Sequence, residues 1–248
     1  MRIKTKKIMI PFLTLALSVV FTSTSFADSQ ENEKIYEKVS NNPAFKIISP
    51  NNSGSFSFTN APDVDQQTYN QAIQEIEALR MREMIKEQNT ISPQASIEYT
   101  YYRSAEGTDP LKKLKASHHD TVKYYAGDLI TNDLVVWSGN SYSFLNSDTR
   151  ANTINQSDEF SVTGQKGSGL GFSWPASGSV NFEPGNNSAQ IVWDELTDGK
   201  QYDYQNYYSG VRAEFYNISY STHSTTARYR VGNTGYLSTA TSNVDFPG

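Results

Sequence analysis

The change to strand-forming sequence begins at Ser96-Ile97-Glu98-Tyr99-Thr100-Tyr101-Tyr102. In this stretch Ile97, Tyr99 and Tyr101 fall on one face, and the residues between them fall on the other. Alternation with a period of two is typical of a half-buried β-strand. Similar short segments follow along the rest of the chain, over residues 121–125, 133–137, 141–145, 159–163, 170–174, 179–182, 190–193, 201–204, 210–220, 227–231 and 236–240.

Turn-forming sequences separate these segments, namely Ser138-Gly139-Asn140, Pro184-Gly185-Asn186-Asn187, Thr197-Asp198-Gly199 and Gly232-Asn233-Thr234-Gly235. Closely spaced short strands with turn residues between them favour an antiparallel fold. We therefore predict a mainly β protein, an antiparallel β-sandwich of two sheets. The sequence contains no repeat of fixed period, which argues against a propeller or a solenoid.

The N-terminal side of this region contains the one long amphipathic helix that the sequence predicts, over about 65–88. Apolar residues such as Tyr69, Ile76 and Leu79 recur at helical spacing. Asp63 or Asp65 can serve as the N-cap, and Pro93 follows the expected end of the helix. We expect the apolar face to pack on the protein's own domain, with docking of a partner as the alternative.

The first 27 residues have the three parts of a cleavable secretory signal peptide. Four basic residues precede the apolar run 8–21, and Ser25-Phe26-Ala27 supplies the small residues that a signal peptidase recognises. The apolar run is shorter than the roughly 20 residues of a spanning helix. We predict cleavage between Ala27 and Asp28 and an extracellular protein, with an uncleaved N-terminal anchor as the alternative.

After the signal peptide we divide the chain into two parts. Residues 28–63 are polar and contain three prolines, so we expect a mobile arm or a pro-segment. The short apolar patch at 44–48 is the part of this arm that could add an edge strand or dock on the main domain. Residues 64–248 are expected to form a single domain of one helix and a β-sandwich.

Composition restricts the partners and the chemistry of this protein. The chain has no cysteine, which excludes disulfides and thiolate metal sites. Removing the signal peptide takes away four basic residues and no acidic residue, so the formal charge changes from −5 to −9. This acidity disfavours nucleic acids and anionic membranes as partners. The tight basic cluster that remains contains Lys112, Lys113 and Lys115.

The three histidines of the chain are His118, His119 and His223. His118-His119-Asp120 contains metal-ligand and acid-base residue types, but adjacent residues of a strand point to opposite faces. We therefore interpret this tripeptide as a polar turn that follows a short basic helix over 109–117, and we predict no metal site. Whether His118, His119 and His223 meet in the fold stays open, and a hydrolase built from them is the third functional hypothesis.

Other candidate chemistry is weak. Asp194, Glu195 and Asp198 stand close together and could bind calcium, but a solvated turn explains the Asp-Gly pair without an ion. No serine lies in the Gly-x-Ser-x-Gly pattern of a nucleophile elbow. We therefore expect neither a catalytic residue nor a cofactor.

Tyrosines concentrate in the last third of the chain. Exposed tyrosine offers a flat apolar face and a hydroxyl for contact with sugars or proteins. The predicted contact residues are Tyr202, Tyr204, Tyr207, Tyr208, Tyr216 and Tyr220. We therefore expect a secreted, non-enzymatic protein that recognises a protein or polysaccharide at a cell surface, or that self-associates as a matrix component. The alternative is a membrane-active, bacteriocin-like toxin that assembles through amphipathic strands.

Overall fold

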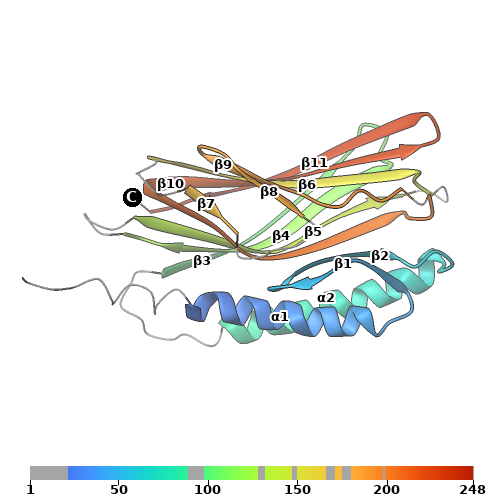
Figure 1. Ribbon diagram of the computed structural model, residues 1–248, viewed down its shortest axis with the longest axis horizontal. Coiled ribbons are helices and arrows are strands. Elements are labelled where there is room, and N and C mark those ends of the chain that lie inside the picture. The colour runs from blue at the N-terminus through green and yellow to red at the C-terminus, as the bar shows by residue number, and fades with distance from the viewer. Residues whose placement is uncertain are drawn as a thin grey trace, which may run out of the picture.

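The computed structural model describes residues 22–88, 98–127, 132–146, 150–165, 171–174, 180–197 and 199–247 (Figure 1). For 22–29 and 84–88 it describes the helical backbone alone. The protein is mainly β and antiparallel, as predicted, and its described residues contain two helices. In chain order the elements are α1 Thr22–Ser40, β1 Phe45–Asn52, β2 Ser55–Asn60, α2 Gln66–Gln88, β3 Glu98–Thr108, β4 Leu114–Tyr125, β5 Asp133–Leu145, β6 Thr153–Gln165, β7 Gly171–Ser173, β8 Asn181–Pro184, β9 Ser188–Val192, β10 Asp203–Val231 and β11 Thr234–Asp245.

Strand β10 organises the sheet because its two halves have different partners. The first half pairs with β5, β2 and β7, and the second half pairs with β6 and β11. The hydrogen-bonded path runs β3-β4-β5-β10-β6-β9-β8. The register of β10 shifts between Tyr208 and Val211, where Gly210 has a φ of 72°. A residue with positive φ bends the strand at little cost only when it is glycine.

Side chains of β4 and β5 face those of β6 and the second half of β10 across an interior layer. For example, the Ser141 hydroxyl on β5 donates to the Asp158 carboxylate on β6 over 2.6 Å. Aromatic contacts such as Trp137 with Phe160 lie in the same layer. This arrangement is consistent with a β-sandwich-like fold.

The structure bears out helix α2 and adds helix α1, which the sequence analysis did not predict. Tyr69 and Ile76 of α2 are buried, and the Asp65 carboxylate caps the helix by accepting the Thr68 N–H over 2.9 Å. Helices α1 and α2 lie side by side along one side of the molecule, next to the β1–β2 hairpin (Figure 1). Neither helix, over its described residues, is long and apolar enough to cross a membrane.

Residues 28–63, which we expected to be a mobile arm or a pro-segment, form most of α1 and the β1–β2 hairpin. The apolar patch at 44–48, which could add an edge strand, lies largely in β1. Ile35 and Val39 occupy one face of α1 and are buried, and Phe45 of β1 is also in the core. Strand β2 pairs with β10, and the Phe56 ring stacks on Tyr207 at 4.8 Å. A few well-spaced apolar residues are therefore enough to dock this polar segment on the sheet.

Two local predictions in the β4–β5 region are wrong. Residues 109–117 do not form a helix, because the Asp109 side chain accepts the N–H groups of Leu111, Lys113 and Leu114 in a turn, and β4 starts at Leu114. The expected turn around Gly139 lies inside β5. A Cβ at Gly139 would overlap the His119 carbonyl oxygen, so the glycine serves the close approach of β4 to β5.

Candidate functional site: a buried His-Asp cluster

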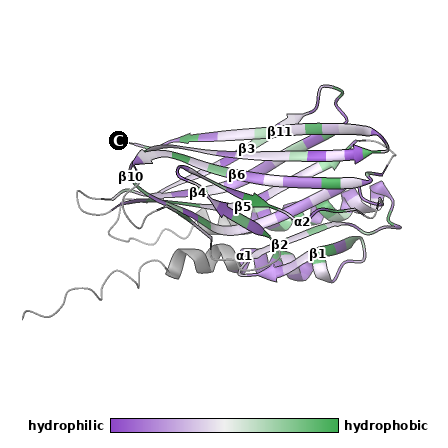
Figure 2. Cartoon of the chain, turned by 45° about the horizontal axis from the view of Figure 1, so that its top comes forward, coloured by the Kyte–Doolittle hydropathy of each residue, from purple (hydrophilic) through white to green (hydrophobic). Residues whose placement is uncertain are grey.

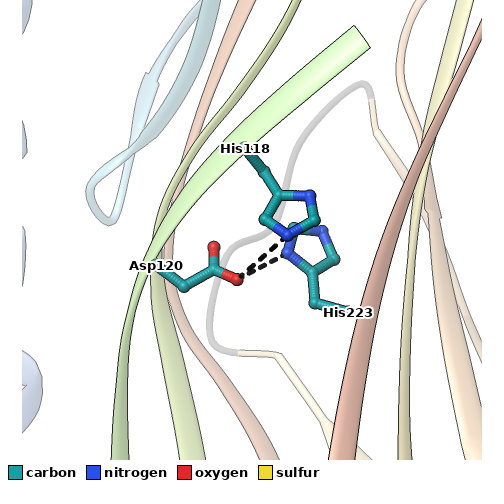
Figure 3. Close-up of side chains that lie close together, drawn as sticks. All are labelled: His118, Asp120 and His223. Atoms are coloured by element: carbon teal, nitrogen blue, oxygen red, sulfur yellow. Dashed lines mark hydrogen bonds and ion pairs between the residues drawn. The ribbon is translucent and has the colours of Figure 1, made fainter. Parts of the chain in front are cut away.

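Two histidines and two aspartates meet in the interior layer of the sheet. His118 and Asp120 come from β4, Asp158 from β6 and His223 from β10. None of these four residues is more than 2% exposed. Figure 3 shows His118, Asp120 and His223 converging between the strands. The expected polar turn at residues 118–120 is therefore a part of β4 in which His118 and Asp120 are buried and His119 is half-buried, and the fold brings His118 and His223 together.

The alternation of β4 decides which of its residues enter the cluster. His118 and Asp120 are two positions apart, so they share the inward face. His119 points the other way and its ring lies 5.9 Å from that of Tyr142. The three histidines consequently do not form one site. The spacing of His118 and Asp120 was the available sequence signal, and it was missed because the segment was interpreted as a turn.

His223 bridges the two carboxylates. Its Nδ1 lies 2.7 Å from Asp120 Oδ2, and its Nε2 lies 3.0 Å from Asp158 Oδ1. The Phe160 ring stacks on the His223 imidazole at 4.4 Å. These contacts on both nitrogens and on one ring face hold the imidazole in a single orientation.

Further donors complete the hydrogen bonding of the carboxylates. Asp158 accepts the Ser141 hydroxyl and the Trp193 indole N–H, both over 2.6 Å, and the Thr225 hydroxyl over 2.5 Å. Asp120 accepts the Tyr208 hydroxyl on its other oxygen. Buried carboxylates are stable in a protein interior only when they are paired and hydrogen-bonded in this way.

His118 has a different environment from His223. Its Nδ1 lies 3.1 Å from the Thr225 hydroxyl and its Nε2 lies 2.7 Å from the Ser242 hydroxyl. Ser242 is half-buried, so the Nε2 side of His118 lies nearest to solvent. The two imidazole rings are 4.0 Å apart.

Burial and charge set opposite protonation states for the two rings. Burial lowers the pKa of His118 to about 4, and the His223 charge beside it acts in the same direction. Burial also opposes the charged form of His223, but Asp120 and Asp158 outweigh this effect and raise its pKa to about 9. Burial raises the pKa of both carboxyls, whereas the His223 charge and the hydrogen-bond donors hold it below the usual value. At neutral pH the cluster therefore holds an imidazolium between two carboxylates, and a neutral His118.

The predicted contact tyrosines differ in their solvent exposure. Tyr202, Tyr204, Tyr207 and Tyr208 are at most 2% exposed, whereas Tyr216 is 41% exposed and Tyr220 is half-buried. Residues 203–211 of β10 are buried at every position, because β2 and α1 cover one side and the interior layer covers the other. A recognition surface made of all six tyrosines is therefore not formed.

The remaining predicted sites are dispersed. The Asp194 carbonyl accepts the Tyr204 hydroxyl and the Glu195 carboxylate accepts the Asn155 amide, whereas Asp198 lies outside the described residues. In the basic cluster, Lys115 pairs with Glu106 over 2.6 Å and the other two lysines are exposed. The backbone at Ala27 and Asp28 lies within helix α1.

The outer face of β6, β10 and β11 offers a surface with different chemistry. Side chains that alternate with the buried ones point outward and are rich in hydroxyl groups, such as Ser224 and Thr226, which contact Thr241 and Thr239 across the β10–β11 pair. Hydrophilic and neutral colours predominate along β6 and β11 in Figure 2. At the hairpin end of this face lies a groove of about 400 Å³, lined by Thr153, Asn155, Arg228, Tyr229, Arg230, Asn233, Gly235, Tyr236 and Leu237.

Comparison with known proteins adds little to this geometry. No protein-family model matches the chain, and no curated protein matches its sequence. A solved collagen-binding domain from a Staphylococcus aureus adhesin is similar over 63% of this chain and 100% of its own length, with 9% identity and a TM-score of 0.27. A similarity of this size carries no argument about function.

Proposed function

We propose that the chain is an exported, non-enzymatic binding protein, a two-sheet β-sandwich that binds a negatively charged polysaccharide at a cell surface. The observation that supports this proposal is the groove at the β10–β11 hairpin, where two arginines and an aromatic side chain stand on a hydroxyl-rich face. We name this surface, lined principally by Asn155, Arg228, Arg230, Tyr236 and Leu237, the hairpin groove.

The two arginines supply a local positive charge for an anionic sugar on a chain that is acidic overall. Arg228 and Arg230 are two positions apart on β10, share the outward face and are both exposed. Within the described part of the chain neither forms an ion pair with a carboxylate, and Arg230 donates its Nε–H to the Gly232 carbonyl. A guanidinium that is not paired with a carboxylate of the protein can bind the two oxygens of a carboxylate or sulfate at once.

The neighbours of the arginines suit a sugar ring. Arg228 lies opposite Asn155 of β6 and Leu237 of β11, and Tyr236 is next to Leu237. The amide and the hydroxyls of this face can exchange hydrogen bonds with sugar hydroxyls, and a tyrosine ring packs well on the flat face of a sugar. The combination of charge, amide and one aromatic ring favours a saccharide over a large apolar protein surface.

Two observations support binding without catalysis. The residues that line the hairpin groove include no histidine, aspartate or glutamate. The Glu195 carboxylate accepts the amide of the lining residue Asn155 over 3.1 Å, but one carboxylate does not supply both a general acid and a general base. The His-Asp cluster, which has those groups, is buried. The β10–β11 hairpin does not suit the membrane-active alternative. A membrane-inserting hairpin needs one apolar face, and the inward face of β10 contains polar residues such as His223 and Thr225.

The test is sedimentation or affinity electrophoresis of the mature protein with polygalacturonate and dextran sulfate, with neutral dextran as the control polymer. We expect binding to the anionic polymers that weakens with salt, and at least tenfold weaker binding by the Arg228→Gln/Arg230→Gln double variant. The matched control is Lys112→Gln/Lys113→Gln, which removes the same charge from an exposed site elsewhere. Equal binding by both double variants, or no binding to either anionic polymer, would overturn the proposal.

Two further measurements separate the alternatives. An intact N-terminus at Met1 in the mass spectrum of the secreted protein would contradict export with cleavage before Asp28. Dye release from phosphatidylcholine or phosphatidylglycerol vesicles would support the membrane-active alternative instead of polysaccharide recognition.

A further inference from the structure

We propose that His118, Asp120 and His223 bind one divalent transition-metal ion of the zinc class and that the ion joins β4 to β10. This proposal is independent of the hairpin groove. The three side chains supply two imidazole nitrogens and one carboxylate oxygen, which is a common donor set for zinc. One donor atom from each residue lies within 4.8 Å of the other two.

The donor atoms are close to the spacing that a metal needs. In Figure 3 a ring nitrogen of each histidine points toward the same carboxylate oxygen of Asp120. The distances to that oxygen are 2.7 Å from His223 Nδ1 and 3.9 Å from His118 Nε2. Ligands about 2.0 Å from a tetrahedral ion are about 3.3 Å apart. The observed distances lie on either side of that value, so small side-chain rotations would seat the ion.

The second polar atom of each ligand already has a partner. His223 Nε2 contacts the Asp158 carboxylate at 3.0 Å, and His118 Nδ1 contacts the Thr225 hydroxyl at 3.1 Å. The Asp120 oxygen that does not face the histidines, Oδ1, accepts the Tyr208 hydroxyl. Outer partners of this kind orient metal ligands, and a carboxylate behind a ligating histidine is especially frequent. This outer set distinguishes the cluster from a chance grouping of polar residues.

Charge and access are also compatible with an ion at this position. Asp120 and Asp158 carry two negative charges in the interior, and in the metal-free protein the His223 imidazolium is paired with both of them. An ion bound at His223 Nδ1 replaces the proton on that nitrogen, so the ion takes over the pairing of the carboxylates. A divalent cation matches that charge. The fourth position lies toward Ser242, whose hydroxyl is 2.7 Å from His118 Nε2 and which is half-buried. The Ser242 hydroxyl or a water molecule can occupy it.

Because the ligands are buried, the experiment loads the metal during folding. The mature protein is unfolded in guanidinium with EDTA, refolded with zinc chloride, passed through a desalting column and analysed by mass spectrometry for zinc. We expect about one zinc per chain in the wild type and a loss of most of it in the His118→Gln and His223→Gln variants. His119→Gln is the matched control, because it removes the neighbouring imidazole that faces away from the cluster, and it should retain the zinc.

A second readout does not depend on the variants. Refolding the wild type with cobalt should produce the visible absorption bands of tetrahedral cobalt, and circular dichroism checks that each variant has folded. A wild-type protein that contains no zinc and shows no cobalt bands would overturn the proposal. Zinc content that is equal in His118→Gln, His223→Gln and His119→Gln would assign any bound metal to another place and would overturn it too.

Discussion

The substitution Asp158→Asn tests whether the buried cluster holds the two groups of strands together. Asp158 is fully buried and accepts four hydrogen bonds, two on each oxygen. Asparagine keeps one oxygen, and its NH₂ group must face either the Ser141 and Trp193 donors or the Thr225 and His223 side. The Trp193 N–H can only donate, so the first orientation sets a donor against a donor. The second orientation sets the NH₂ group against the protonated His223, whose ring nitrogens also only donate. In either orientation His223 loses one of its two carboxylates.

The expected loss is large for one atom exchanged. Removing one partner of a buried, hydrogen-bonded charge pair costs about 3–5 kcal/mol, because the remaining charge is left buried. We expect the free energy of unfolding of Asp158→Asn to fall by about this amount at pH 7. The assay is guanidinium unfolding in EDTA, followed by tryptophan fluorescence and analysed by linear extrapolation.

The control for this experiment is Glu159→Gln, at the next position of β6, where the side chain is exposed on the opposite face. It should change the free energy of unfolding by less than about 0.5 kcal/mol. The Asp158→Asn penalty should also shrink above the His223 pKa of about 9, because a neutral imidazole no longer needs two carboxylates. A loss below about 1 kcal/mol, or a penalty that does not change with pH, would refute this reasoning.

Three further predictions test other parts of the structure. The pKa of His223 rises from 6.5 unfolded to about 9 folded, so its contribution to stability is complete below pH 6.5 and is lost as the pH rises through 9. Unfolding curves of the metal-free protein in EDTA should therefore show stability falling from pH 7 to 9 in the wild type and not in His223→Gln. A flat wild-type profile would contradict this. A Cβ at Gly107 would overlap the Thr239 carbonyl, where β3 meets β11. In denaturant unfolding, Gly107→Ala should therefore lower the free energy of unfolding by about 1–3 kcal/mol. The control Gly235→Ala places its Cβ in open space and should not lower it. Ile35 of α1 is fully buried. Ile35→Ala should therefore lower the free energy of unfolding by about 2–5 kcal/mol and lower the midpoint of thermal unfolding. An unchanged midpoint would instead indicate that α1 is a mobile arm.

Local patterns were reliable where one face of an element is solvated. The stripe that includes Tyr69 and Ile76 predicted α2, and the structure shows that Asp65, one of the two N-cap candidates with Asp63, caps the helix. The alternation from Ile97 to Tyr102 predicted a strand where β3 lies. Both patterns depend on the contrast in hydrophobicity between a solvent-exposed face and a buried face. A single segment shows this contrast in its own sequence.

Predictions from sequence patterns failed where an element lacks this contrast, or where a contact with a distant part of the chain determines the local structure. Residues 203–211 of β10 are buried on both faces, yet they include polar residue types, so the sequence has no apolar face that marks the segment as core. Its tyrosines were therefore predicted to lie on the surface. Gly139 resembled a turn residue, although the approach of the neighbouring strand requires it there. Helix α1 was missed because so few of its residues are apolar, and their value depends on the hairpin against which they pack.

By itself the sequence determined an antiparallel, cysteine-free, acidic β protein with one clear amphipathic helix, because residue type, spacing and charge are local properties. Only the tertiary structure decided that His118 and Asp120 meet Asp158 and His223, since the Asp120–His223 contact joins positions 103 residues apart and Asp158 lies 65 residues from His223. Alternation tells which face a side chain takes, but strand pairing and the packing of layers choose the partner it meets there. The hairpin groove depends on the same choice, because the register of β10 with β6 and β11 sets Arg228 between Asn155 and Leu237.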